Sequence, residues 1–558
     1  MAMEDRIREA VGKALAKMGV LDATFAIEWP GDETHGDYAT NVAMAAYTYV
    51  ENPPEGGPKA FAEELLPHIR EALGTYVDSV EVAGPGFINF RLSPGVVREE
   101  IARVVGAGER YGAGNEAAGK RIIIEYTDPN PFKEMHIGHL MSNVIGESIA
   151  RLIENNGATI TRACYQGDVG PHVAKALWGL RDAEIVEPGN AAELGKAYAH
   201  GAAAYEKSEK AKAEITVLNQ ALYAGDDTAL MELWRKGRDI SLEAFEEIYK
   251  TLGTKFDYYF FESECSAPGV AQVEKNTPGV FTKSQGAVIY EGERKGLHTL
   301  VFITSQGTPT YEAKEIGLAF LKEERWPTDE SYILTAAEQV GHFKVVKAAL
   351  AEIAPTLGTK THHIPHGFLR LTSGKMSSRE GTVITAESLI NDMVRKAGER
   401  NADPLIAEAV ALGAIKYMIL RQASGGDIVF DPEKSLSLEG DSGPYLQYSY
   451  VRAQSVLAQA EEKSSTIYGT ADAPTEPYTI ERFIIRFPKV VARAERERAP
   501  HHLTQYLTSL ASEWNSFYAQ ERIIGGEYEN YKLLVAEAFA HTMKRGLSLL
   551  GIPSPERM

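Results

Sequence analysis

The chain has 558 residues, of which 44 % are hydrophobic and 24 % charged, and its formal net charge is −19. These values indicate a globular protein of two to four domains of about 150 residues each. The acidic charge excludes a uniformly basic nucleic-acid binder, although a local basic surface remains compatible with RNA.

Further classes are excluded by the cysteine count and by hydropathy. The only two cysteines, Cys164 and Cys265, exclude a disulfide framework and a metal site of three or four cysteines. No apolar run reaches the roughly 18 to 20 residues of a membrane span. The amphipathic N-terminus lacks the apolar core and the cleavage site of a signal peptide. We therefore expect a cytoplasmic protein that binds no membrane, no DNA and no protein-held metal.

Residues 1–112 are expected to form a small α+β domain. The segments 3–20 and 58–73 show the apolar spacing of amphipathic helices. In "VDSVEVAGPGFINFRLS" two alternating runs flank Gly84, Pro85 and Gly86, which is typical of a hairpin turn. The glycine- and alanine-rich stretch that follows predicts a linker.

Residues 113–435 alternate apolar strands with amphipathic helices, which predicts a Rossmann-type parallel α/β sheet. The expected strands are "RIIIEY", "ATITRACY", "LVFIT", "SYILTAA" and "HHIPHGFLRL". A charged and largely helical stretch at about 175–290 is too long for a connection, so we interpret it as an insertion. From 436 to 558 only helical spacing remains, which predicts an all-α bundle.

The segment "EYTDPNPFKEMHIGHLMSNVIGES" (125–148) passes from a strand through a proline-rich turn into a helix. Such a turn directs backbone N–H groups and the positive end of the helix dipole to one point, where phosphate is the usual guest. His136 and His139 are three residues apart, so they share a face of the first helical turn and can donate to a phosphate. Gly138 leaves room for a flat purine. The alternative is two surface histidines at a helix start.

A second segment, "LRLTSGKMSSREGTVIT" (369–385), is a Gly/Ser loop that carries Lys375 beside Met376, Ser377 and Ser378. A lysine on such a loop can reach a triphosphate and neutralise the charge that builds up on departing pyrophosphate. The alternative is a solvated surface turn. Both segments in one α/β domain, in this order, favour nucleotide chemistry.

This pair resembles the "HIGH" and "KMSKS" signatures of class I aminoacyl-tRNA synthetases, and further segments are similar to arginyl-tRNA synthetases. The similar segments are "DPNPFKEMHIGHL" (128–140), "GTPTYEAKEIG" (307–317), "AAEQVGHF" (336–343), "LEGDSGPYLQYSYVRAQSVL" (438–457), "GDYATNVAM" (36–44) and "GPGFINFRL" (84–92). The resemblance covers nearly the whole chain and implies an N-terminal tRNA-binding domain and a C-terminal anticodon-binding domain.

The resemblance implies that arginine and ATP form arginyl-adenylate, with Mg²⁺ accompanying ATP, and that arginine then passes to the 3′ end of tRNA(Arg). It places catalytic roles on His136, His139, Lys375 and Lys133, and ATP contacts on His136, Gly138, His139, His342, Lys375, Met376, Ser377 and Ser378. His342 is alternatively a packed histidine. Because Lys133 and Lys375 are both present, the division of labour between them stays open.

A guanidinium substrate requires carboxylates and an aromatic partner in its pocket. The resemblance places arginine contacts on Glu125, Asn130, Tyr311, Glu315 and Gln339. Glu315 departs from the family's usual aspartate, and its reach is one methylene longer. Taken singly, Tyr311 or Gln339 would be an ordinary polar residue at the edge of the core.

For tRNA contact, the five cations Arg482, Arg486, Lys489, Arg493 and Arg496 have the spacing of one basic stripe on a helix, interrupted at Pro488. The alternative is a solvated face that pairs with Glu495 and Glu497. The expected tRNA contacts are Tyr445, Tyr448, Arg452, Arg486, Arg493, Tyr518 and Arg522. We expect a monomer.

Two other functions are compatible with part of these patterns. A regulatory paralogue without catalysis would be expected to lose the phosphate-handling residues, which are intact here. A nucleotidylyltransferase for small molecules would not need the two terminal domains.

Overall fold

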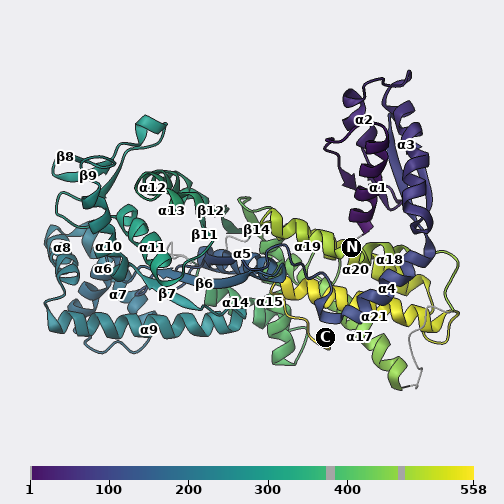
Figure 1. Ribbon diagram of the computed structural model, residues 1–558. Coiled ribbons are helices and arrows are strands. Elements are labelled where there is room, and N and C mark those ends of the chain that lie inside the picture. The colour runs from purple at the N-terminus through teal and green to yellow at the C-terminus, as the bar shows by residue number, and fades with distance from the viewer. Residues whose placement is uncertain (1–2, 373–383, 463–471) are drawn as a thin grey trace. The chain divides into compact units, whose positions relative to one another are not determined.

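The computed structural model describes residues 3–372, 384–462 and 472–558 (Figure 1). The chain forms two compact units. The first contains Met1–Tyr111, Arg452–Phe487 and Ser512–Thr542, and the second contains Gly112–Val451, Pro488–Ala511 and Met543–Met558.

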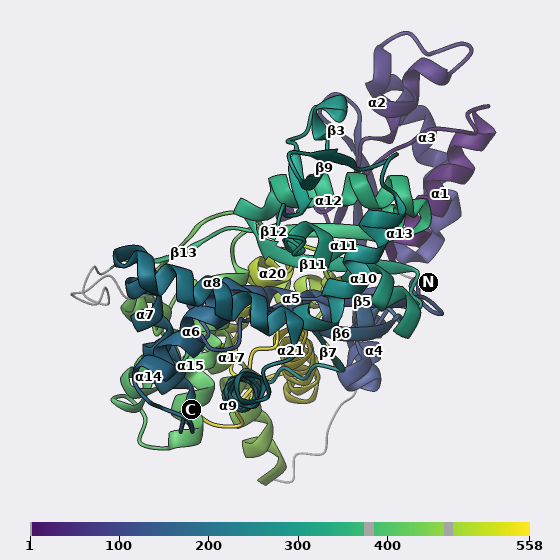
Figure 2. The same cartoon turned by 90° about the vertical axis from the view of Figure 1, so that its left-hand side faces the viewer.

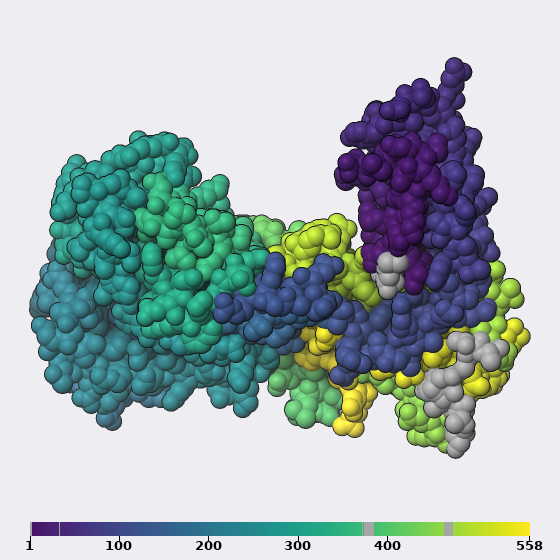
Figure 3. Space-filling model, viewed as in Figure 1, coloured from purple at the N-terminus to yellow at the C-terminus, as the bar shows by residue number. Residues whose placement is uncertain are grey.

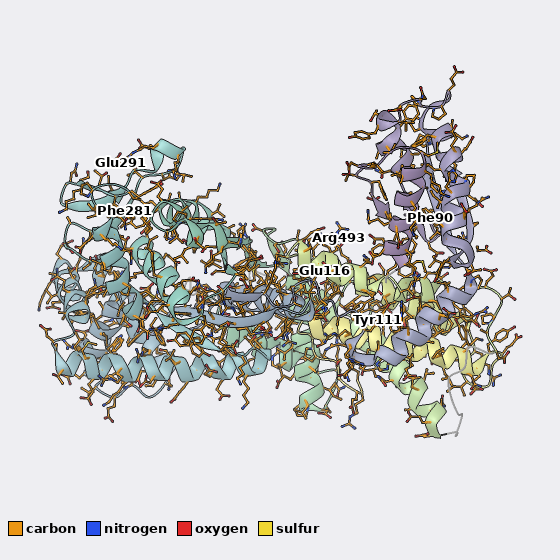
Figure 4. The ribbon with its side chains drawn as sticks, viewed as in Figure 1. Phe90, Tyr111, Glu116, Phe281, Glu291 and Arg493 are labelled. Carbon is orange, nitrogen blue, oxygen red and sulfur yellow. The ribbon has the colours of Figure 1, made fainter. Side chains whose placement is uncertain are left out.

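The N-terminal part of the first unit is an antiparallel sheet covered by helices. Its strand order is β1-β2-β4-β3, and the hairpin at residues 84–86 is confirmed, because β3 and β4 pair antiparallel across it. Alternate residues of β4, among them Ile88 and Phe90, point into the core with α1 and α3 (Figure 4). The elements are α1 Met3–Lys17, β1 Ile27–Glu28, β2 Tyr38–Thr40, α2 Val42–Ala46, α3 Gly57–Leu73, β3 Val77–Ala83, β4 Phe87–Leu92 and α4 Pro94–Ala107.

The later segments of the first unit are helical, and a buried ion pair joins them to the N-terminal sheet. Asp37 lies just before β2, accepts the backbone N–H of Leu92 at 2.7 Å and pairs with Arg482 on α18 (Thr479–Ile484). Trp514 is fully buried and stacks on Phe539 with ring centroids 4.6 Å apart. The stacked rings come from α20 (His501–Gln520) and α21 (Glu529–Leu549).

The interruption of the basic stripe expected at Pro488 is confirmed, because α18 ends at Ile484 and α19 (Phe487–Arg496) begins immediately before Pro488. The expectation that all five cations share one stripe is wrong. Arg482 is buried against Asp37 and is therefore part of the core rather than of a surface stripe.

The second unit is built on a five-stranded sheet of order β12-β11-β5-β6-β7 in which every neighbouring pair is parallel. This confirms the expected α/β class. The β-branched run Ile122–Ile124 is almost fully buried because β5 is the central strand. The strands are β5 Arg121–Glu125, β6 Thr159–Gln166, β7 Tyr258–Phe261, β11 Glu330–Ala336 and β12 Thr361–His366.

From β5 the chain first builds outward to β6 and β7 and then returns to the other side as β11 and β12. The gap between β5 and β11 is therefore the topological switch point, where ligands bind at the carboxyl ends of parallel strands.

The helices are α5 Ile137–Asn155, α6 Pro171–Asp182, α7 Ala191–Lys207, α8 Glu209–Ala224, α9 Thr228–Leu252, α10 Glu262–Lys275, α11 Tyr311–Arg325, α12 Val340–Ile353, α13 Pro355–Lys360, α14 Ala386–Gly398, α15 Pro404–Leu420, α16 Pro432–Ser435 and α17 Gly443–Glu462.

Two segments expected in the parallel sheet, 300–304 and 362–371, lie wholly or partly in other sheets. Residues 300–303 form β10, but it pairs antiparallel with β9 (Ala287–Tyr290) in a separate sheet that also contains β8 (Thr282–Ser284). Phe281 fills the core beneath this sheet (Figure 4). The segment 362–371 splits into β12 and β13 (Leu369–Leu371), and β13 pairs with β14 (Ile428–Phe430).

Helices α6–α9 lie between β6 and β7 in the chain and form their own core around Leu177, Leu194 and Trp234. Figure 2 shows α6, α7 and α8 packed side by side, in agreement with their contacts. In the space-filling view these helices and the residues that follow them to about 350 form one unbroken mass (Figure 3).

Residues 548–553 are bound to earlier segments of the second unit through their backbone carbonyls. Lys416 on α15 donates to Leu252 O at 2.6 Å and to Gly551 O at 2.5 Å, and burial lowers the pKa of Lys416 to about 7. Ser148 on α5 donates to Leu549 O at 3.1 Å. Among the described residues no helix is long and apolar enough to cross a membrane.

We predict that Asp37→Ala destabilises the protein by about 3 to 5 kcal/mol, because it leaves the buried Arg482 without its counter-ion. The free energy of unfolding in urea measures this change. Asp22→Ala, at an exposed position of the same unit, is the matched control and should stay within about 0.5 kcal/mol of the parent. Equal stability of the two variants would mean that the ion pair contributes nothing to the fold.

Candidate active site

The histidine pair lies at the start of α5, directly beyond the loop that follows β5. His136 is the N-cap residue, and its Nδ1 accepts the backbone N–H of Gly138 at 3.0 Å. The backbone N–H of His136 donates to Nδ1 of His139 at 3.2 Å. The two rings stack with centroids 3.6 Å apart, which confirms that they share one face of the helix.

These hydrogen bonds select the tautomer of both rings, that is, which ring nitrogen carries the proton. Because each Nδ1 accepts a backbone N–H, each neutral ring carries its proton on Nε2 and can donate from there. Burial, together with the Lys133 charge, lowers the pKa of His136, and burial with the His136 and Lys133 charges lowers that of His139 well below its usual range. The pair is therefore a set of two neutral N–H donors near neutral pH.

Gly138 is required by this arrangement. A Cβ at Gly138 would lie 2.9 Å from two atoms of the His136 ring. The position that a Cβ would take at Gly138 is thus filled by the imidazole ring of His136. Contact between Gly138 and ATP stays a prediction.

The predicted loop residues Lys375, Met376, Ser377 and Ser378 lie outside the described residues, but the chain that follows them is anchored at the histidine pair. Ile137 N–H donates to Ile384 O at 3.2 Å, and Ala386 N–H donates to Met135 O at 2.7 Å. Residues 384–386 therefore run beside residues 135–137.

A cavity of about 330 Å³ opens at the carboxyl ends of the strands, at the switch point. All five residues predicted to bind arginine line it, and so does His342: Glu125, Asn130, Tyr311, Glu315, Gln339 and His342. They come from the end of β5, the loop after it, α11, the 3₁₀ turn that precedes α12, and α12 itself. The structure thus brings together residues that are up to 217 positions apart in the chain.

The cavity is acidic, with two ion pairs in its wall. Glu125 is 1 % exposed and pairs with Lys322 at 2.5 Å, while Glu262 pairs with Lys314 at 2.6 Å. Burial and the Glu125 charge raise the pKa of Glu315 to about 8. The same two causes, in the same order, raise the pKa of Asp128 well above its usual range. The Glu315 and Asp128 carboxyls can therefore lose a proton and become negatively charged when a cation enters the cavity.

Sequence reasoning missed several of these residues. Asp128, Tyr165 and Glu262 line the cavity, and Lys322 neutralises its deepest carboxylate. A signal for Lys322 was present, because Tyr311, Glu315 and Lys322 are spaced by four and seven residues and so share one face of α11. His342 lies 3.3 Å from Glu312 and edge-on to Phe343.

The residues predicted to bind tRNA are divided between the two units. In the first unit the Arg452 guanidinium lies 4.8 Å from the centroid of the Tyr518 ring, and Arg486 lies 4.5 Å from that of Phe483. Arg522 donates to Ile524 O at 3.3 Å. In the second unit Tyr445 and Tyr448 are half-buried on α17, and Arg493 on α19 pairs with Glu497 at 3.1 Å (Figure 4).

The fold and the histidine pair are those of a class I aminoacyl-tRNA synthetase, and residues 100–431 match the family model for tRNA synthetases class I (R), catalytic domain. Residues 4–92 match the arginyl-tRNA synthetase N-terminal domain, and residues 446–558 match the DALR anticodon-binding domain. The chain belongs to the arginyl-tRNA synthetase family, as the sequence resemblance indicated.

Individual relatives are similar along their whole length. The arginine–tRNA ligase of Lactobacillus delbrueckii subsp. bulgaricus is 30 % identical, with 99 % of each chain covered, and that of Treponema denticola is 29 % identical, with 97 % of this chain and 96 % of the relative covered. The structure of Thermus thermophilus arginyl-tRNA synthetase superposes with a TM-score of 0.80 at 26 % identity over all of both chains.

Proposed function

We propose that the protein activates L-arginine with ATP and transfers the arginyl group to the 3′ end of tRNA(Arg). The observation that carries this proposal is the acidic cavity at the switch point, in which Glu125 and Glu315 offer carboxylates to one cation. A guanidinium forms paired hydrogen bonds with carboxylates, which fixes its orientation as well as its charge. Tyr311, Asn130 and Gln339 would orient the remainder of the arginine molecule.

In the activation step an oxygen of the arginine carboxylate attacks the α-phosphorus of ATP. The bond from that phosphorus to the oxygen shared with the β-phosphate breaks, and pyrophosphate leaves. His136 and His139 would stabilise the growing charge with their Nε2–H groups, since preorganised donors act most strongly in the transition state. Lys133, Lys375 and the serines beside Lys375 would hold the phosphates.

Magnesium would enter with ATP. In the described ranges no three His, Cys, Asp or Glu side chains are grouped to hold a metal ion. Mg²⁺ commonly binds through substrate phosphates and keeps several waters. We therefore propose that the ATP phosphates hold the ion, which would offset the charge on the leaving pyrophosphate.

In the second step a hydroxyl of the terminal ribose of tRNA attacks the arginyl carbonyl, and AMP leaves. We propose that residues 1–112 and 436–558 hold the tRNA around the catalytic domain, 113–435. The enzyme would act as a cytoplasmic monomer. The intact histidine pair favours this function over a paralogue without catalysis, and the two terminal domains favour it over a ligase of small molecules.

The decisive experiment is ATP–pyrophosphate exchange with each amino acid in turn, with and without total tRNA. We expect exchange with arginine alone among the amino acids, and aminoacylation of tRNA(Arg) in the same preparation. Exchange that depends on another amino acid, or that is absent under every condition, would contradict the proposal.

We predict that arginine binding releases a proton from Glu315. The carboxyl is protonated in the empty cavity below a pKa of about 8, whereas a bound guanidinium favours the ionised form. Arginine affinity should therefore rise by up to about tenfold for each pH unit between 6 and 8 and then level off. Calorimetric titration at several pH values measures this dependence.

Glu315→Gln is the matched control for that titration, because it keeps the shape and removes the proton. Its affinity should be lower at pH 8.5 and should lose most of the pH dependence. An unaltered slope in Glu315→Gln would assign the proton to another group, of which Asp128 is the nearest candidate.

For tRNA we predict that Arg493→Ala together with Arg496→Ala raises the dissociation constant and flattens its salt dependence. Both side chains are more than half exposed on α19, and each phosphate contact contributes about 0.7 to 0.9 to the slope against log salt. Filter binding over a salt series measures the slope. Arg294→Ala, an exposed arginine that likewise pairs with a nearby acid, is the control and should leave the slope unchanged. An unchanged slope in the double variant would mean that α19 is a solvent-exposed face that does not contact tRNA.

A further inference from the structure

The helices between β6 and β7 have no role in the function proposed so far, yet they contact the loop that precedes the histidine pair. Phe132 in that loop is fully buried with φ 67°, a conformation that costs energy unless its surroundings hold it. Its backbone N–H donates to Ser241 Oγ on α9 at 2.9 Å, and Ser241 in turn donates to Gly237 O at 2.8 Å. A Cβ at Gly237 would lie 2.2 Å from the Phe132 ring, so α9 closely fits this ring.

The next residue of the loop, Lys133, meets a second helix of the same group. Its Nζ lies 4.5 Å from the centroid of the Tyr198 ring on α7, which is within the range of a cation–π interaction. Tyr198 itself is half-buried and packs on the core of α6–α9. The side chain of Lys133 is thereby held against α7.

Lys133 precedes the N-cap residue His136 by three positions, so its backbone is fixed close to the start of α5. Besides burial, its charge depresses the pKa of His136, His139 and His172. The loop geometry and the Tyr198 ring therefore set where the Lys133 ammonium stands in the loop that precedes the histidine pair.

We propose that Tyr198 is a positioning residue that holds the Lys133 ammonium in place to bind the ATP phosphates, so that the helical segment 171–252 builds one wall of the phosphate site. The inference rests on the proposed function, since it assigns the lysine to ATP. It also explains why an aromatic ring suits position 198. A ring attracts the ammonium without cancelling its charge, whereas a carboxylate there would compete with the phosphates.

The test compares Tyr198→Leu, Tyr198→Phe, Lys133→Ala and the double variant Lys133→Ala/Tyr198→Leu in the full-length enzyme with tRNA present. Leucine keeps an apolar side chain on the core of α6–α9, and phenylalanine keeps the ring without the hydroxyl. The readouts are kcat and the KM for ATP in pyrophosphate exchange, the affinity for ATP and for arginine by calorimetry, and the thermal midpoint.

We expect Tyr198→Leu to reduce kcat/KM for ATP about three- to thirty-fold, the range that a cation–π contact supports, with arginine affinity and thermal midpoint unchanged. Tyr198→Phe should retain the parent activity. In the Lys133→Ala background the leucine substitution should have no further effect, because the group that Tyr198 positions is already absent.

Three results would overturn the inference: parental activity of Tyr198→Leu, independent and multiplicative losses in the double variant, or equal losses with leucine and phenylalanine. Failure of the proposed function gives a different pattern, in which the unsubstituted enzyme shows no arginine-dependent exchange. In that case the same four variants are compared by their affinity for ATP alone. Equal ATP affinity of Tyr198→Leu and the parent protein would then reject the contact.

Discussion

The loop between β5 and α5 is the constraint on which the catalytic unit depends. In ten residues it passes from the buried end of the central strand to the histidine pair. Three of its non-glycine residues adopt positive φ, namely Thr127 at 80°, Asp128 at 50° and Phe132 at 67°. Each such residue costs on the order of 1 to 3 kcal/mol and persists only where several contacts hold it.

The contacts that hold this loop come from three directions. Ser142 on α5 accepts the N–H of Thr127 at 2.9 Å, Asp128 accepts the N–H of Tyr165 at 2.7 Å, and Ser241 on α9 accepts that of Phe132. The neighbouring strand and two helices thus fix this loop, which connects Glu125 at the end of β5 to His136 at the start of α5. Sites held in this way are preorganised, so little reorganisation is needed when charge develops.

The cavity and the histidine pair differ in charge because the loop places them on different sides of the site. The cavity collects carboxylates and balances part of their charge with Lys322 and Lys314, so that it retains attraction for a cation. At the histidine pair, burial and the nearby Lys133 charge lower the pKa of both rings and so favour their neutral form. A cationic substrate and an anionic one can therefore meet at the same edge of the sheet without sharing a binding surface.

Sequence reasoning recovered the parts of this structure that local patterns encode. Apolar runs predicted β5, β6 and β11, and the pattern around residues 84–86 predicted the hairpin. The aromatic strand β7 escaped notice because four residues inside a long helical stretch carry little periodic signal. Strand β10 was predicted but assigned to the wrong sheet, since hydrophobicity identifies a strand and not its partner. Arg482 was misread because its partner Asp37 is 445 residues away in the chain, a distance that helical spacing cannot reveal.

The carbonyl anchors at residues 548–553 also set the order in which the enzyme can be completed during synthesis. Gly551 follows Lys416 by 135 residues, an interval of roughly 7 to 27 seconds at the usual rates of translation. Until that segment leaves the ribosome, Lys416 on α15 lacks the Gly551 carbonyl and Ser148 on α5 lacks the Leu549 carbonyl. The parallel sheet is encoded early in the chain but gains these contacts late, so a nascent chain that stops before residue 549 would lack both of them.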